Sequence, residues 1–395
     1  MDPLTFEQAR SSVLEMVAAA RTTPATEEIA LREADGRVLA APLLADRDFP
    51  ALSRSIRDGF AVRSAETPGR LRVSGEVRAG ESFGGKAAAG EAIEIMTGAP
   101  VPAGTDAVVM VEHTRREDGF VEVPSAEAGQ FINPQGSEAR AGETLLRAGQ
   151  RIDYAGVALA AATGTTHLRV YVRPRVAILP TGDEVVPLEG VPAPHQVRNS
   201  NAAALEAQVL RAGGTPWPRP VVPDDLAATR AAIEHALAAD LLLFSGGVSA
   251  GKYDVVERAL ADLGAEFFFD RVRIQPGQPL VFGRVRGKFF FGLPGNPLST
   301  MVTFELFARA AVELLCGQLE PLLPLLHARL ASDFRHKPGL TRFLPARLAS
   351  DGAVEAVPWH GSSDLTAAGR ANAFLVADAD REQWSKGELI RVLVR

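Results

Sequence analysis

The chain has 395 residues, of which 46% are hydrophobic and 23% charged, and its formal net charge is −6. This length exceeds what one hydrophobic core usually supports, so we expect several domains. Because the net charge is negative, the chain has no overall positive potential to attract a polyanion. No apolar run reaches the about 20 residues that are needed to span a bilayer. We therefore expect a cytoplasmic protein that has neither nucleic acid nor a membrane as its partner.

The first half of the chain divides into a scaffold and an insertion. Residues 5–21 have apolar side chains at helical spacing and predict an amphipathic helix. Between 38 and 145, short β-like runs are separated by Gly and Pro turns, which indicates a small β domain. The flanking segments resemble two halves of one unit. We therefore expect a split scaffold over 1–45 and 141–172, with a β-rich domain inserted over 46–140.

The second half has a different pattern, in which buried strands alternate with helices. The runs 175–180, 241–246 and 288–295 are apolar throughout, as in strands that are buried on both faces. Ala- and Leu-rich helical segments separate them, which predicts βαβ units on a mostly parallel sheet. The expected fold class is therefore multidomain α/β plus β. It combines a three-layer α/β domain over 173–320 with the β-rich insertion and a C-terminal β domain over 325–395.

Each predicted buried strand runs directly into a polar loop that contains glycine, at 181–184, 245–254 and 293–299. The carboxyl ends of parallel strands share one edge of a sheet, and ligands bind in the crevice there. Glycines let backbone N–H groups approach an anion, and the helix that follows adds its positive end. Tight turns would explain any single loop. Three such loops in register predict a site for phosphate or another oxyanion.

Acidic residues in these loops point to a cation as well. Asp183, Glu184 and Asp254 would repel a bare phosphate unless a divalent cation such as Mg²⁺ bridged the two. Helix capping is the alternative explanation for each carboxylate. The seven histidines show no HxxxH or HxH pairing, which argues against zinc. The single Cys316 lies in an apolar helical run and is expected to be a buried core thiol rather than a nucleophile.

Three loops of the insertion also carry reactive groups. Segment 53–64 places Arg54, Arg57 and Asp58 close together, which is more charge than a plain hairpin turn needs. Thr97 precedes a glycine and two prolines, so a rigid loop offers its hydroxyl and free N–H groups. Glu138 lies in a third, Gly-flanked loop.

Seven motifs occur in one fixed order along the chain: SxxDGFAV (55–62), MTGAPVPxGxDAVV (96–109), ILPTGDE (178–184), RNSN (198–201), SGGVSxGxYD (245–254), PGxP (276–279) and GLPGNPxS (292–299). Together they resemble the molybdopterin molybdenumtransferase family, the MoeA type that includes the E domain of gephyrin. The resemblance spans about residues 5 to 375.

The resemblance implies a MogA-like α/β domain, a C-terminal β-barrel-like domain and a homodimer whose active site lies between protomers. It implies that the enzyme inserts molybdate, its substrate, into adenylylated molybdopterin with release of AMP, in a step that depends on Mg²⁺. A MogA-type adenylyltransferase is a further expected partner.

The family's functional residues carry over onto matching positions of this chain. The resemblance implies catalytic roles for Asp58, Thr97, Glu138, Glu184 and Asp254, of which Glu184 and Asp254 would hold the metal. It implies substrate binding by Thr181, Gly182, Asp183, Ser200, Asp224, Ser245, Gly246, Gly247, Ser249, Gln275, Gln278, Pro294, Gly295, Asn296, Pro297, Arg342 and Ser362, with Ser363 beside the last.

Two departures from the family pattern affect charge. Glu138 stands where Asp is common, which keeps the charge on a longer side chain. Gln275 and Gln278 stand where many members have lysines. A neutral amide donates a hydrogen bond roughly half as strong as a charge-assisted one, so affinity for an anion is expected to fall unless Arg271, Arg273 or Lys252 compensates.

Three other functions fit parts of the sequence. The α/β domain alone resembles a molybdopterin adenylyltransferase, although the β domains and the DGFAV segment argue against it. A gephyrin-like scaffold protein is a second alternative. A paralogue that prefers tungstate is a third, because the two oxyanions are almost equal in size and charge.

Overall fold

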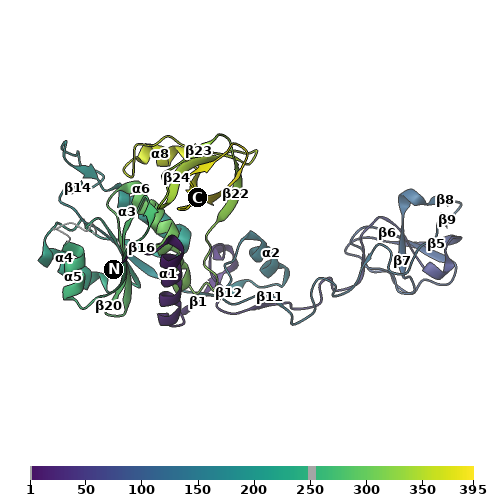
Figure 1. The fold of residues 1–395 in the computed structure, drawn as a ribbon. Coiled ribbons are helices and arrows are strands. Elements are labelled where there is room, and N and C mark those ends of the chain that lie inside the picture. The colour runs from purple at the N-terminus through teal and green to yellow at the C-terminus, as the bar shows by residue number, and fades with distance from the viewer. Residues whose placement is uncertain (1, 248–254) are drawn as a thin grey trace.

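The computed structural model describes residues 2–247 and 255–395. The molecule is elongated, with the inserted β sheet at one end and the α/β and C-terminal parts at the other (Figure 1). Among the helices of these described residues, none is both long and apolar enough to cross a membrane. The expected multidomain α/β plus β fold is confirmed.

The scaffold consists of segments from both sides of the insertion. Strand β1 (Thr26–Ala30) pairs antiparallel with β12 (His167–Tyr171), and helix α2 (Tyr154–Ala162) packs with the turn η1 (Leu31–Glu33) over a small core. Helix α1 (Phe6–Ala20) begins at Thr5, which forms a capping box with Gln8. Its buried side chains, including Phe6 and Val13, pack into the α/β core. The helix expected over 5–21 is therefore confirmed, and it joins the scaffold segment to the α/β sheet.

A narrow antiparallel ribbon leads to the inserted domain. It is formed by β2 (Leu43–Leu44) with β11 (Thr144–Leu146), and by β3 (Arg54–Ser55) with β10 (Ile132–Asn133). Beyond it lies a six-stranded sheet in the order β7-β4-β6-β5-β9-β8. Its strands are β4 (Gly59–Val62), β5 (Gly69–Val77), β6 (Glu91–Ile95), β7 (Ala107–Met110), β8 (Arg115–Glu117) and β9 (Phe120–Val123), with the turns η2 (Ser64–Glu66) and η3 (Val111–His113).

The α/β domain has a six-stranded sheet in the order β16-β13-β17-β21-β20-β18. The strands β16 (Thr215–Pro218), β13 (Arg175–Pro180), β17 (Leu241–Ser245) and β21 (Lys288–Leu293) are parallel to one another, whereas β20 (Pro279–Val285) and β18 (Glu266–Arg271) are antiparallel to their neighbours. The strands expected over 175–180, 241–246 and 288–295 are thus confirmed as β13, β17 and β21.

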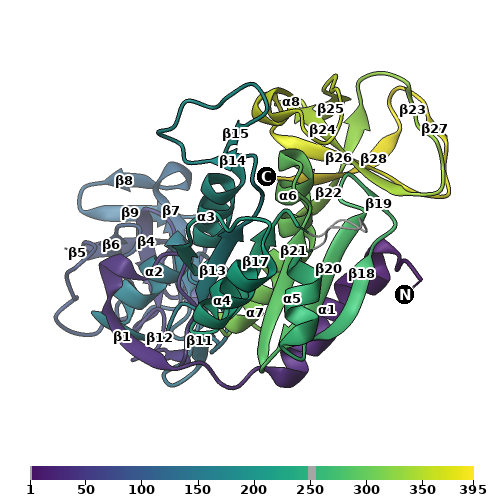
Figure 2. The ribbon, with the colours of Figure 1, turned by 90° about the vertical axis from the view of Figure 1, so that its left-hand side faces the viewer.

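Helices cover both faces of this sheet. One face packs against α3 (Ser200–Ala212), α6 (Pro297–Thr303), the π-helix η4 (Phe304–Ala308), α7 (Arg309–Leu315) and α1. The other packs against α4 (Leu226–Ala236) and α5 (Val255–Asp262), which lie in front of the strands in Figure 2. A short ribbon of β14 (Val185–Val186) and β15 (Val197–Arg198) projects from the edge where the strands end.

The C-terminal domain is a small barrel. The pairings β24-β25, β25-β22, β22-β28, β28-β26 and β26-β24 return to the starting strand and close a ring. The strands are β22 (Leu325–Leu330), β24 (Thr341–Leu348), β25 (Ala353–Ala356), β26 (Ala373–Ala377) and β28 (Leu389–Val394), with β23 (Phe334–Arg335) paired to β27 (Gln383–Trp384) and helix α8 (Leu365–Arg370) alongside. Strand β19 (Ile274–Gln275), which follows β18 of the α/β sheet, pairs with β24 and ties the two domains together.

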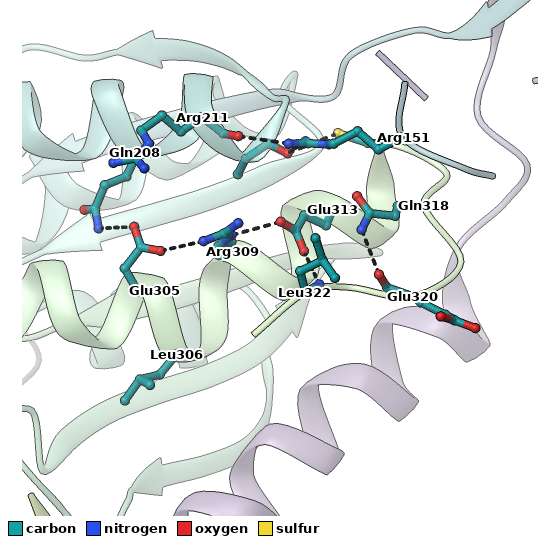
Figure 3. Close-up of polar contacts among 12 residues, drawn as sticks. Arg151, Gln208, Arg211, Glu305, Leu306, Arg309, Glu313, Gln318, Glu320 and Leu322 are labelled. Atoms are coloured by element: carbon teal, nitrogen blue, oxygen red, sulfur yellow. Dashed lines mark hydrogen bonds and ion pairs between the residues drawn. The ribbon is translucent and has the colours of Figure 1, made fainter. Parts of the chain in front are cut away.

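A buried polar network holds α7 to the segment that leads into β22 (Figure 3). Arg309 donates from Nε to Glu313 Oε1 at 2.9 Å and from Nη1 to Glu305 Oε2 at 3.1 Å. Glu313, whose side chain is 1% exposed, also accepts a hydrogen bond from the N–H of Leu322 at 2.9 Å. Burial alone would lower the pKa of Arg309, but the hydrogen bond and charge of Glu313, together with Glu305, raise it overall.

Cys316 ends α7 within the same region and is buried, as expected from the sequence. Burial raises the pKa of its thiol to about 12. A thiol that stays protonated at neutral pH is a poor nucleophile, so this side chain serves packing.

We expect Glu313→Ala to lower the free energy of unfolding by about 3 kcal/mol, because it leaves the guanidinium of Arg309 and the N–H of Leu322 without their acceptor. A urea titration followed by circular dichroism measures this change. The double variant Arg309→Met with Glu313→Leu removes both charges and should lose less. A single variant as stable as the wild type would show that the network does not hold the helix.

Candidate functional site

A large cavity lies where the parallel strands end. It has a volume of about 890 Å³, and we call it the sheet-edge cavity. The loops after β13, β17 and β21 converge on it, and the β14–β15 ribbon and the start of α8 complete its walls. The predicted site residues that line it are Thr181, Gly182, Glu184, Ser200, Asp224, Ser245, Gly246, Gly247, Pro294, Gly295, Asn296 and Pro297, together with Ser363.

Glycines allow these loops to touch. Gly246 has φ +97°, a left-handed conformation, and a Cβ on Gly295 would lie 3.5 Å from the Cα of Gly246. A Cβ on Gly247 would lie 2.9 Å from Thr181 Oγ1, closer than real side chains approach. Larger residues would separate the loops or fill the space between them. The absence of side chains therefore leaves backbone exposed to a ligand.

Two lining side chains have buried polar atoms without a partner among the described residues. Asn201 donates from Nδ2 to the carbonyl oxygen of Gly295 at 2.8 Å, but its Oδ1 accepts nothing there. Thr181 Oγ1 is likewise buried and unpaired. Buried groups of this kind usually cost about 1–3 kcal/mol unless something satisfies them. Their place beside the cavity is typical of a ligand site.

Glu184 and Asp224 line the same cavity, and Asp183, which does not line it, lies beside them. Asp183 Oδ1 accepts a hydrogen bond from the N–H of Asp224 at 3.2 Å, so these two loops are in contact. Partial burial raises the pKa of Asp224, and the negative charges of Asp183 and Glu184 raise it further. Like charges held this close favour a proton or a cation between them. Oxygen donors of this kind fit the preference of Mg²⁺.

The other expected metal ligand does not belong to the described part of the chain. Asp254 and Ser249 lie outside the described residues. Within 2–247 and 255–395, no three His, Cys, Asp or Glu side chains form a ready-made metal site. The described carboxylates are therefore a partial donor set.

The C-terminal barrel forms one wall of the cavity. Asn296 Nδ2 donates to Ser362 Oγ at 2.8 Å, and the N–H of Leu298 donates to the carbonyl oxygen of Ser362 at 3.0 Å. Ser362 thus supports a lining residue rather than lining the cavity itself. Gln275 is in register with Arg342 across the β19–β24 pair. Neither of these two nor Gln278 lines the cavity, although the neighbouring Pro279 does.

A second cavity of about 450 Å³ lies at the base of the inserted domain, and we call it the insertion cavity. Thr97 and Glu138 line it, as does Arg54. The other lining residues are Arg47, Asp48, Phe49, Pro50, Ala51, Ser55, Ile56, Gly98, Asn133 and Ala162.

Hydrogen bonds hold the reactive groups in and beside this cavity, where Asp58 does not line the cavity itself but is bonded to Thr97, which does. Asp58 Oδ1 accepts from the N–H of Thr97 at 2.6 Å and from its hydroxyl at 2.7 Å. These bonds, the backbone bond first, lower the pKa of Asp58, so the carboxylate stays ionised. Glu138 Oε1 accepts from Asn133 Nδ2 at 2.8 Å.

The two cavities do not meet within one chain. The sheet-edge cavity belongs to the end formed by the α/β and C-terminal domains, whereas the inserted domain extends from the opposite side of the scaffold (Figure 1). The predicted residues therefore form two separate groups, with Asp58, Thr97 and Glu138 in one and Glu184 and Asp224 in the other.

Sequence reasoning missed several lining residues. Arg47, Asp48 and Asn133 of the insertion cavity carried no motif, and their positions follow from the β3–β10 pair and the ribbon at the domain base. Pro192 and Val197 of the β14–β15 ribbon also line the sheet-edge cavity. Asn201 was visible in the sequence as the last residue of the RNSN motif.

Comparison with known proteins accounts for this arrangement. The family models "MoeA N-terminal region (domain I and II)", "Probable molybdopterin binding domain" and "MoeA C-terminal region (domain IV)" match residues 4–164, 177–314 and 327–394. The chain is 36% identical to a molybdopterin molybdenumtransferase of Nostoc sp., over 93% of this chain and 88% of that protein. It is 33% identical to that of Bacillus subtilis, over 93% and 90% of the two chains.

Solved structures agree with the sequence comparisons. A molybdopterin biosynthesis MoeA protein from Pyrococcus horikoshii has a TM-score of 0.81 at 26% identity, with both chains covered completely. A second structure from that organism has a TM-score of 0.73 at 29% identity, covering 100% of this chain and 99% of that one. The fold and the two cavities thus define a multidomain molybdopterin biosynthesis protein. The chain belongs to the MoeA family, the molybdopterin molybdenumtransferases.

We expect Asp183→Asn to lower the pKa of Asp224, because the variant removes one of the two like charges that raise it. Asp224 would then lose its proton at a lower pH than in the wild type. Carboxyl ¹³C chemical shifts, followed by NMR over a pH titration, measure the change. The substitution Asp46→Asn, in an exposed residue near the insertion, is the matched control and should leave Asp224 unchanged. An Asp224 titration that does not move in Asp183→Asn would contradict the assigned cause.

Proposed function

We propose that this protein inserts molybdate into adenylylated molybdopterin and releases AMP. The observation that carries the proposal is the sheet-edge cavity, where exposed glycine backbone and repelling carboxylates lie side by side. That combination suits a phosphorylated ligand that arrives with a divalent cation. Membership of the MoeA family names the ligand. An adenylyltransferase of the MogA type would supply the adenylylated substrate.

The residues of the sheet-edge cavity bind and orient this substrate. The backbone at Gly246, Gly247 and Gly295 lies against the phosphates, and the unpaired Thr181 Oγ1 and Asn201 Oδ1 offer hydrogen bonds to the ligand. Glu184, with Asp183, Asp224 and Asp254, would hold Mg²⁺. When bound, this ion would polarise the phosphoanhydride and neutralise the charge that develops on it.

The reaction breaks the phosphoanhydride of the substrate. An oxygen atom of water or of molybdate forms a bond to the phosphorus of the molybdopterin phosphate while the bridging P–O bond breaks, and the bridging oxygen leaves with its electron pair as part of AMP. Asp58, which the hydrogen bonds of Thr97 keep ionised, accepts a hydrogen bond or proton from the incoming group. Most of the rate enhancement would come from positioning and electrostatic stabilisation, because no covalent nucleophile is required.

We further propose that two copies of the chain share each active site. Thr97, to which Asp58 is hydrogen-bonded, and Glu138 line the insertion cavity, whereas Glu184 and Asp224 line the sheet-edge cavity. A C₂ dimer can place the inserted domain of one protomer over the sheet edge of the other, and the symmetry then creates two equal sites. A homodimer is therefore part of this proposal.

The enzymatic proposal predicts AMP release when purified protein receives adenylylated molybdopterin, molybdate and Mg²⁺. Chromatography of the nucleotides measures the product. Replacing molybdate by tungstate tests which oxyanion is preferred, and chelation of Mg²⁺ should abolish release. No AMP with either oxyanion would sink the proposal. Adenylylation of molybdopterin by added ATP would instead support an adenylyltransferase.

The shared site predicts that two inactive variants restore each other. Asp58→Ala damages the insertion cavity and Glu184→Ala damages the sheet-edge cavity, so each alone should be inactive. Random re-association of equal amounts gives mixed dimers with one intact site, and we expect about a quarter of wild-type activity. The matched control mixes Asp58→Ala with Thr97→Ala, which damage the same cavity and should stay inactive. If dimers that have exchanged subunits recover no activity, the active site is not shared between protomers.

A further inference from the structure

The sheet-edge cavity has little positive charge for an anionic ligand. Glu184, Asp224 and Arg198 are the charged residues among those described that line it. The guanidinium of Arg198 is already engaged, because Nε donates to the carbonyl oxygens of Leu188 at 3.1 Å and Gly190 at 3.0 Å. The cation of this cavity thus stabilises the β14–β15 ribbon, and the remaining charges repel phosphate.

Arg271 and Arg273, the two described candidates for compensating charge, do not line the sheet-edge cavity. Gln275 and Gln278 are neutral amides. Arg273, which had been a candidate for compensation, donates from Nη2 to the carbonyl oxygen of Gly339 at 3.3 Å and so supports the C-terminal barrel. Positive charge for the ligand must therefore come from a bound metal, from the undescribed loop or from another surface.

In the insertion cavity, the carboxylates are hydrogen-bonded and a cation is left without a partner among the described residues. Arg54 lines it, is exposed, and has no hydrogen-bond or ion-pair partner for its guanidinium in the described part of the chain. The carboxylates there are already engaged. Asp48 accepts from Gln135 Nε2 and from the N–H of Ala141, each at 3.0 Å, and Glu138 accepts from Asn133. The guanidinium of Arg47 is paired with Asp46 at 3.7 Å, so what the cavity offers a ligand is the five-donor guanidinium of Arg54.

The backbone around Arg54 is rigidly held. The N–H of Ser55 donates to the carbonyl oxygen of Ala99 at 3.0 Å, and the N–H of Gly98 donates back to Ser55 at 2.8 Å. One residue earlier, the carbonyl oxygen of Ser53 accepts from Val101 at 2.9 Å. These bonds fix the backbone of Arg54 beside the loop of Thr97, so only its side chain has to be ordered on binding.

We propose that Arg54 of one protomer binds the phosphoanhydride oxygens of the ligand held in the sheet-edge cavity of the other. It provides across the dimer the positive charge that Gln275 and Gln278 do not provide. The inference rests on the shared active site proposed above. Arg54 is a ligand-binding residue on this account, and its planar guanidinium matches two phosphate oxygens at once.

Binding of inorganic pyrophosphate in the presence of Mg²⁺ provides a readout that does not depend on turnover. We expect Arg54→Gln to weaken binding about tenfold in isothermal titration calorimetry, because a charge-assisted bidentate contact is lost. Arg54→Lys keeps the charge and should recover part of the affinity. The matched control is Arg147→Gln, at an exposed arginine that lines neither cavity and has no side-chain partner among the described residues. An unchanged dissociation constant in Arg54→Gln would overturn the proposal.

The mixed dimers show which protomer's arginine acts. In a mixture of Asp58→Ala and Glu184→Ala chains, the working site takes its insertion cavity from the Glu184→Ala chain. Adding Arg54→Gln to that chain should raise the KM for adenylylated molybdopterin about tenfold, whereas adding it to the Asp58→Ala chain should leave KM unchanged.

These outcomes separate the two proposals. If activity recovers in the mixture but KM is the same whichever chain carries Arg54→Gln, the role of Arg54 is wrong and the shared site stands. If no mixture recovers activity, the shared site itself fails and the role of Arg54 fails with it.

Discussion

The close approach of the loops that follow β17 and β21 is the constraint on which the site depends. A Cβ on Gly246 would lie 2.9 Å from the carbonyl oxygen of Thr181, so position 246 requires glycine, and Gly295 packs against it. Because the two strands are adjacent and parallel, their ends necessarily share one edge of the sheet. The glycines turn this shared edge into a cavity lined by backbone. Glu184 and Asp224 line the same cavity because their loops leave the same edge.

Several contacts around the sheet-edge cavity lower the stability of the fold when no ligand is bound. Asp224 is held near two like charges, and Thr181 and Asn201 keep polar atoms buried without partners in the described structure. Each arrangement is unfavourable without a ligand. Stability comes from elsewhere: the sheet is covered by apolar side chains on both faces, and the Arg309–Glu313 pair secures the connection to the barrel. Strain at the ligand site and dense packing behind it are consistent with a preorganised binding surface.

Much of the α/β domain was predictable from the sequence because its strands and helices produce recognisable patterns within short segments. Uninterrupted apolar runs identified β13, β17 and β21, and the rule that parallel strands end at one edge placed their loops together. The β14–β15 ribbon was not predicted, since two-residue strands leave almost no pattern. The pairing of Gln275 with Arg342 was also missed, because it joins segments 67 positions apart that belong to different domains. The roles of Asp58 and Glu138 came from the family resemblance, and their place in a separate cavity required the fold.

The inserted domain shows why a sequence can contain all parts of a site and still not show how they assemble. Asp58 and Glu184 both belong to recognisable motifs, but the narrow ribbon of β2, β3, β10 and β11 carries one of them away from the other. In the proposed dimer, a sheet-edge cavity whose described lining holds no free cation would face an insertion cavity with Arg54, which is unpaired in the described part of the chain. Dimer association and catalysis would then depend on the same charge complementarity between the two cavities. The charges of the two cavities would be balanced only when the ligand, the metal and the partner protomer are all in place.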